Sequence, residues 1–200
     1  IHASTAKEIF NLNDSQINND YRRKAKAINF GILYGISPYG LAKQLDISNT
    51  EAKDYINEYF IKYPKIKKYM EHQIDFAKTN QYVETIFKRK INIKGITDKN
   101  FAVRGFAERQ AINAPIQGSA ADIIKLAMIE IHKEIKLKNI EAEMLLQVHD
   151  ELIFEVESKK YENLVSNVKT IMESVHLKYK DFSVPLTVDF GAGDHWGQAH

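Results

Sequence analysis

The sequence predicts an α+β fold in which a mostly helical first part is followed by a short antiparallel sheet backed by helices. Three observations favour this class. Apolar residues recur at helical spacing through most of residues 1–80 and again over residues 100–133. Two apolar runs rich in strand-forming residues flank a His-Asp pair within residues 143–157, as is typical of a tight hairpin. A hydrophobic content of 44% over 200 residues is enough for a sizeable core.

Composition narrows the possible functions. The net charge is only +2, so contact with a nucleic acid must come from local basic patches, and such patches lie at residues 22–26, 62–68 and 88–94. The absence of cysteine excludes disulfides and thiolate metal sites and fits a reducing compartment. No apolar run approaches membrane-spanning length. Because the sequence begins with Ile1 rather than methionine, we expect a fragment of a longer protein.

The first 80 residues are predicted to form helices separated by helix-ending residues. We expect helices over residues 1–12, 21–34, 38–45, 49–63 and 65–80, with a polar turn at 14–20. Gly35 ends the second helix, Ser37-Pro38 begins the third, Ser48 begins the fourth, and Pro64 separates the last two.

The remaining residues are predicted to mix strands and helices. We expect a strand at 82–86, then one long helix or two in series around Pro115 within residues 100–133. A hairpin over 143–157, a helix over 158–178 and a strand at 184–188 complete the chain.

A basic and aromatic stripe is predicted on the helix at 21–34. At about 100° per residue, Arg22, Lys26 and Phe30 follow one another along one face, and Tyr34 lies one turn further on. Two cations followed by two rings suit an elongated ligand with phosphates at one end and a flat base at the other. The alternative is an ordinary amphipathic helix with a solvated basic face.

This stripe, followed by the run INFGILYG, resembles motif B of the family A DNA polymerases. The resemblance implies that the helix closes over the incoming deoxynucleoside triphosphate and that Arg22 and Lys26 hold the triphosphate. It also implies that Phe30 stacks near the sugar and base and that Tyr34 lies at the templating position. The run IHASTA is also similar to a stretch of this family, which implies that His2 lies near the triphosphate. A lone histidine is otherwise most often structural or solvated.

A second polar row lies in residues 108–128. Arg109, Asn113 and Gln117 recur every four residues, and all three can donate hydrogen bonds to minor-groove acceptors. A water-facing row is the alternative. The block resembles the template–primer contact helix of the same family, which implies that these residues check the newly formed base pair. We expect Asp122 to be structural.

The predicted hairpin places three polar residues at its tip. We expect apolar residues of both strands to hold this tip rigidly; they are Leu145, Leu146, Val148, Leu152, Phe154 and Val156. An aspartate at a turn is usually only a turn former. However, QVHDE resembles motif C of the family, which implies that Asp150 ligates the catalytic Mg²⁺ ions, that Glu151 is an accessory carboxylate and that His149 touches the primer end.

One family pattern is kept only in part. The chain has YVET and Arg89, but Gln81 and Lys88 stand where the family usually has glycine. The final run GAGDHWGQAH also resembles the end of the family's sequences, so the likeness extends over nearly all 200 residues.

The resemblance implies a fingers subdomain at residues 1–116 and the C-terminal part of a palm at 117–200. It implies a DNA-directed DNA polymerase that transfers a nucleotide to a primer 3′-hydroxyl with two Mg²⁺ ions, with Lys26 joining Asp150 and Glu151 in catalysis. Its partners would be primer–template DNA and deoxynucleoside triphosphates, with no membrane, in a monomeric enzyme of the cytoplasm and nucleoid.

The second aspartate that such a site needs belongs to motif A, which these residues lack, as they lack a thumb. We therefore expect the chain alone to be inactive. The rival interpretations are a non-catalytic nucleic-acid-binding module, a metal hydrolase that uses residues 149–151, and a purely structural helical protein.

Overall fold

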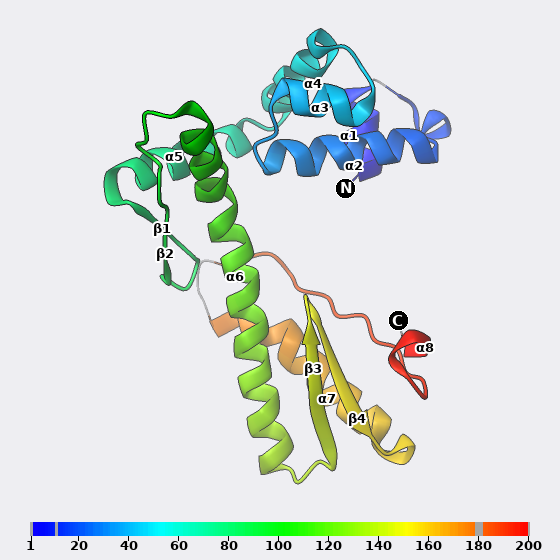
Figure 1. The fold of residues 1–200 in the computed structure, drawn as a ribbon. Coiled ribbons are helices and arrows are strands. Elements are labelled where there is room, and N and C mark those ends of the chain that lie inside the picture. Colours follow the sequence, from blue (N-terminus) through cyan, green and yellow to red (C-terminus); the bar gives the residue numbers. More distant parts are fainter. Residues whose placement is uncertain (1, 11, 179–181, 200) are drawn as a thin grey trace. The chain divides into compact units, whose positions relative to one another are not determined.

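The computed structural model describes residues 2–10, 12–178 and 182–199 (Figure 1). These residues form two compact units. The first contains the described residues up to Val83 together with Lys90–Pro115, and the second contains Glu84–Arg89 and the described residues from Ile116 onward. Helix α6 (Phe101–Leu137) contributes to both units. The predicted α+β class is confirmed, and no helix in the described part of the chain has the length and apolar character needed to cross a membrane.

Helices dominate the first unit. They are α1 (His2–Ile9), α2 (Asn19–Leu33), α3 (Pro38–Leu45), α4 (Asn49–Lys62) and α5 (Pro64–Asn80), with the short 3₁₀ helix η1 (Asp14–Gln16). Three of these helices begin at a residue whose side chain accepts a hydrogen bond from an otherwise unpaired backbone N–H group. Asn18 caps α2, Ser37 caps α3, and Ser48 forms a capping box with Glu51 at α4. Over the described residues, the helices predicted for the first 80 positions are therefore confirmed within a few residues at each end; residues 1 and 11 of the first predicted helix lie outside the described part.

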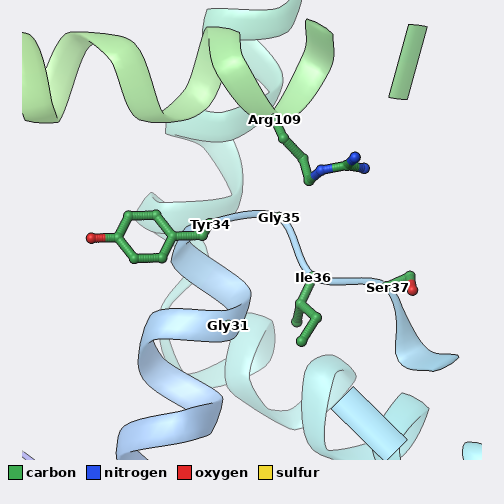
Figure 2. Close-up of a pocket in the computed structure, with 6 residues that line it drawn as sticks. All are labelled: Gly31, Tyr34, Gly35, Ile36, Ser37 and Arg109. Atoms are coloured by element: carbon green, nitrogen blue, oxygen red, sulfur yellow. The ribbon is translucent and has the colours of Figure 1, made fainter. Parts of the chain in front are cut away.

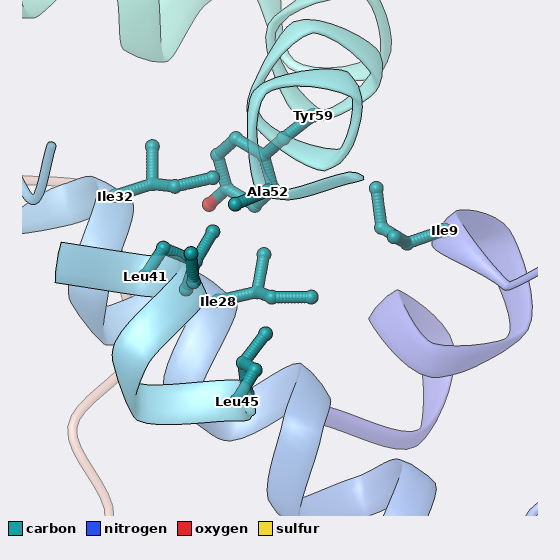
Figure 3. Close-up of a cluster of buried hydrophobic side chains, with 8 residues drawn as sticks. Ile9, Ile28, Ile32, Leu41, Leu45, Ala52 and Tyr59 are labelled. Carbon is teal, nitrogen blue, oxygen red and sulfur yellow. The ribbon is translucent and has the colours of Figure 1, made fainter. Parts of the chain in front are cut away.

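One hydrophobic cluster contains residues from all four helices α1, α2, α3 and α4 (Figure 3). Ile28 and Ile32 of α2 are 0% and 2% exposed, and Figure 3 shows them facing Leu41 of α3 and Tyr59 of α4. Full burial of one such side chain contributes about 1.5–3 kcal/mol. Because this face of α2 is buried, the helix can present only its other faces to solvent.

A second cluster of the first unit lies between α5, the start of α6 and a small sheet. Strand β1 (Tyr82–Glu84) pairs with β2 (Lys90–Asn92), and Val83 and Ile96 pack against Ala107. The Tyr69 hydroxyl on α5 donates a hydrogen bond to the carbonyl of Ile112 on α6, at 2.9 Å. The predicted strand at 82–86 is thus shorter than expected, and its partner β2 was not predicted.

The second unit contains the predicted hairpin. Strands β3 (Ala142–Val148) and β4 (Glu151–Val156) are antiparallel, and η2 (Ser158–Lys160), α7 (Tyr161–Ser174), η3 (Val175–Lys178) and α8 (Trp196–Ala199) follow. One face of the hairpin, with Leu152 and Phe154, packs against Ile131 of α6 and Val175 of η3. Helix α6 runs through Pro115 without a break, which decides between the one-helix and two-helix predictions.

The predicted helix at 158–178 is confirmed in its bounds, although its first and last turns, η2 and η3, are 3₁₀. Two other expectations for the second unit are wrong. Residues 184–188 form no strand, because Pro185 has no N–H to donate and Val188 donates its own to the Glu173 carboxylate at 2.9 Å. Leu145 and Leu146 do not anchor the hairpin: they are 47% and 54% exposed, next to a register shift in β3.

Candidate functional site

Two cations on α2 stand without an ion pair. Asp20 is within 2.7 Å of Arg23 and 3.0 Å of Lys24, and these hydrogen bonds lower the pKa of Asp20. Arg22 and Lys26 are exposed, and among the described residues neither has a carboxylate partner. Two positive charges four residues apart on one helix face are therefore available to an anionic ligand.

Exposed aromatic rings continue this face. Phe30 and Tyr34 are 41% and 39% exposed, and their rings are stacked with centroids 6.1 Å apart and planes 20° apart. The imidazole of His2, on α1, lies 5.5 Å from the Phe30 ring. The structure therefore brings together three of the predicted nucleotide-binding side chains, and their flat faces suit a planar ligand group.

The turn that ends α2 opens into a pocket of about 430 Å³ (Figure 2). Its lining residues are Gly31, Tyr34, Gly35, Ile36, Ser37 and Arg109. Gly35 has φ of +72°, and a β-carbon built there would lie 3.0 Å from Cγ of Arg109. Figure 2 shows Arg109 extending from α6 toward the segment between Gly35 and Ser37. Sequence analysis did not predict this contact between the two candidate sites, because the residues are more than 70 positions apart.

The polar row on α6 is divided between the units. Arg109 and Asn113 belong to the first unit, and the exposed Gln117 belongs to the second. The side-chain oxygen of Asn113 is buried and accepts no hydrogen bond from the described residues. Spacing alone gave no indication that this side chain turns partly inward.

The hairpin tip presents two exposed polar side chains. His149 has φ of +54°, its carbonyl accepts a hydrogen bond from Gln147 Nε2 at 3.0 Å, and Asp150 follows at the apex. Glu151 is half-buried and pairs with Val148 in the ladder. Among the described residues, no three histidine or acidic side chains converge on one point where they could hold a metal. Asp150 can therefore supply one carboxylate to a Mg²⁺ ion, which takes few protein ligands and keeps several waters.

Asp122, predicted to be structural, anchors the segment between β1 and β2. Its side chain is 13% exposed and lies 2.7 Å from Nε of Arg89. The guanidinium of Arg89 also donates to the Gly118 carbonyl at 3.1 Å, and the Ile86 N–H donates to Ser119 Oγ at 3.0 Å. These bonds attach the segment to α6, so the structural role of Asp122 is confirmed.

Comparison with known proteins gives one consistent result. A model of DNA polymerase family A matches residues 1–198. The DNA polymerase I of Rhizobium leguminosarum is 50% identical over 203 residues and that of Bacillus caldotenax is 48% identical over 200, each alignment covering all of this chain. The chain spans only 20% and 22% of the length of these relatives. A solved structure, the POL domain of Pol1 from M. smegmatis in complex with DNA primer-template and dNTP, matches 99% of the chain and 34% of its own length, with a TM-score of 0.91 and 39% identity.

Proposed function

Because the chain belongs to DNA polymerase family A, we propose that it is part of a DNA-directed DNA polymerase that extends a primer on a template. The first unit would then form the fingers and the second the C-terminal part of the palm, close to the predicted division at residues 116 and 117. The substrates would be primer–template DNA and deoxynucleoside triphosphates, bound by a monomer. The relative from M. smegmatis was solved with ligands of both kinds, which supports this choice.

The observation that carries the proposal is the exposed face of α2. It combines Arg22 and Lys26, which have no carboxylate partner among the described residues, with the stacked rings of Phe30 and Tyr34. In the proposed complex the cations bind the triphosphate, Phe30 lies against the sugar and base, and Tyr34 lies at the templating position beside its pocket. His2 contributes a further donor to the phosphates.

At the hairpin tip, Asp150 would hold Mg²⁺ together with an aspartate from motif A, Glu151 would assist it, and His149 would contact the primer end. When bound, the metal ions lower the barrier by stabilising the attacking and leaving oxygens. The primer 3′-oxygen forms a bond to the α-phosphorus and loses its proton to solvent water, while the bond from the α-phosphorus to the pyrophosphate oxygen breaks. Lys26 neutralises the pyrophosphate and can protonate it as it leaves.

Triphosphate binding by the 200-residue chain tests the role of the α2 cations. Charge-assisted hydrogen bonds contribute about 1.5–3 kcal/mol, so Arg22→Ala and Lys26→Ala should each raise the Kd at least about tenfold. Arg23→Ala is the matched control, because Arg23 is bonded to Asp20. Equal losses in all three variants would show that only the overall charge matters.

Primer extension tests whether the 200-residue chain needs the rest of the polymerase for synthesis. We expect the 200-residue chain to show no Asp150-dependent extension, because one carboxylate does not make a two-metal site. In the longer polymerase, Asp150→Asn should abolish synthesis, and Lys26→Ala should reduce turnover far more than duplex binding. Robust extension by the isolated chain that depends on Asp150 would contradict the requirement for motif A.

A non-catalytic nucleic-acid-binding module is the second candidate, because basic and polar faces on α2 and α6 would also serve a binding protein. Such a module has no need of a metal ion to bind a nucleotide. Triphosphate binding that strengthens with Mg²⁺ and weakens in Asp150→Asn would favour the polymerase, and binding indifferent to both would favour the module.

A further inference from the structure

Asn29 links α1 to the exposed face of α2. Its side-chain nitrogen Nδ2 lies 3.1 Å from Nδ1 of His2 and 2.9 Å from the hydroxyl of Thr5. Thr5 is 3% exposed, so it fixes the amide from the protein interior. Asn29 directly precedes Phe30, whose ring lies 5.5 Å from the His2 imidazole. Two neighbouring residues of α2 therefore contact His2.

We propose that Asn29 is a positioning residue that sets the tautomer and the orientation of His2. A primary amide nitrogen donates hydrogen bonds and does not accept them, so Nδ1 of His2 must act as the acceptor. A neutral imidazole carries one ring hydrogen, which this arrangement places on Nε2. Nε2 is then the ring nitrogen left to donate to a ligand.

This inference rests on the proposed function, in which His2 lies near a triphosphate. Ionised phosphate oxygens accept hydrogen bonds, so a neutral histidine can serve them only through a ring N–H. If Nδ1 carried the hydrogen, Nε2 would present a lone pair to the phosphates. Asn29 would thus prepare the donor before the ligand arrives, with no need for His2 to be charged.

The hydroxyl of Thr5 can bond the amide of Asn29 in either orientation. A hydroxyl has one hydrogen to donate and lone pairs to accept, so Thr5 can accept from Nδ2 and donate to Oδ1 of Asn29, which lies 3.3 Å away. The reversed amide would place oxygen opposite Nδ1 and would require the hydrogen there. The tautomer of His2 therefore reports which orientation is present.

Long-range ¹H–¹⁵N NMR of the 200-residue chain tests the proposal without any nucleotide. Correlations between ring protons and ring nitrogens distinguish the two tautomers. The spectra are recorded at about pH 8.5, where an ordinary histidine is neutral. His2→Gln assigns the signals. We expect the wild-type ring to carry its hydrogen on Nε2, and a ring protonated at Nδ1 would overturn the proposal.

Two substitutions of Asn29 extend the test. Asn29→Asp presents only acceptors to Nδ1, so the ring hydrogen should move to Nδ1, whereas Asn29→Leu should leave a mixture of tautomers. Asn19→Asp adds the same charge to the exposed start of α2 and should leave the tautomer unchanged. Persistence of the wild-type tautomer in both Asn29 variants would also overturn the proposal, and the wild-type spectrum decides it even if a variant fails to fold.

Triphosphate affinity separates this inference from the proposed function. If both hold, Asn29→Leu and Asn29→Asp should weaken binding about tenfold, as the loss of one hydrogen bond to a charged group predicts. A tautomer that responds to Asn29 as expected, with unchanged triphosphate affinity, would confirm the positioning role and reject the placement of His2 at the phosphates.

Discussion

Replacing Gly35 by alanine tests the turn that ends α2 beside the pocket. Gly35 has φ of +72°. A left-handed backbone costs an L-residue about 1–2 kcal/mol, while alanine restricts the unfolded chain and recovers about 0.4–1 kcal/mol. The added β-carbon would also lie 3.0 Å from Cγ of Arg109, which must move aside. The backbone terms alone leave a net loss of at most about 1.6 kcal/mol, and the displacement of Arg109 adds to it, so we expect Gly35→Ala to lower the free energy of unfolding by about 1 kcal/mol or more.

Gly105→Ala is a matched control in the same unit. Gly105 lies in the interior of α6, and its added β-carbon would have Nη1 of Arg109 as its nearest neighbour, at an ordinary 3.6 Å. Glycine in a helix interior is about 0.5–1 kcal/mol less favourable than alanine. The same chemical change beside the same arginine should therefore raise stability by about 0.5–1 kcal/mol at Gly105 and lower it at Gly35.

Hydrogen exchange of the Ile28 and Ile32 amides in increasing urea measures the stability of the first unit, since both residues lie in its core and the second unit need not unfold with it. Adding Arg109→Ala to Gly35→Ala should remove the steric part of the loss and leave the backbone part. A neutral or stabilising Gly35→Ala, or complete recovery in the double variant, would refute the assigned backbone strain.

Two further predictions concern the turn after β1 and the buried tyrosine of α5. Lys88 has φ of +63°, a conformation that strains any residue other than glycine. Its side chain is 83% exposed and its ion pair with Glu84, at 3.8 Å, contributes little, so Lys88→Gly should raise the free energy of unfolding by about 0.5 kcal/mol. Lys88→Ala in the same denaturation assay should not raise it. Burial raises the pKa of Tyr69 to about 12 from 10.0, so the folded chain holds this proton more tightly than the unfolded chain. The stability it contributes is present below pH 10 and is lost as the pH rises toward 12. Tyr69→Phe should make stability fall less steeply across this window, and an unchanged slope would contradict the burial effect.

Helices of the first unit could be predicted because the residues that begin and end them act locally. Ser48 and Glu51 satisfy each other's backbone donors within one turn, and Gly35 adopts a backbone conformation that other residues avoid. Strands were harder to predict because a strand exists only where another strand pairs with it. Residues 184–188 have a strand-like composition, yet the Glu173 side chain takes the Val188 N–H instead.

The candidate site likewise has a part that the sequence predicts and a part that it does not. A four-residue spacing was enough to predict the exposed face of α2, because residues four apart on a helix are neighbours. Asn29 escaped detection, since its partners His2 and Thr5 are 27 and 24 residues away and nothing in the sequence pairs them. Contact between Arg109 and Gly35 was missed for the same reason. Tertiary partners determine what a polar side chain does, and periodicity does not identify them.

The sequence itself distinguishes the cations of α2 that are paired from those that are not. Four basic residues crowd positions 22–26, and Asp20 lies three residues before Arg23 and four before Lys24, the separations at which helical side chains meet. Arg22 and Lys26 lie two and six residues from Asp20, out of its reach along the helix. A single acidic residue at the start of α2 thus neutralises two cations of the basic cluster and leaves the other two without a carboxylate partner in the described part of the chain. The spacing rule alone would have selected Arg22 and Lys26 as the pair available to an anionic ligand, with no reference to any relative.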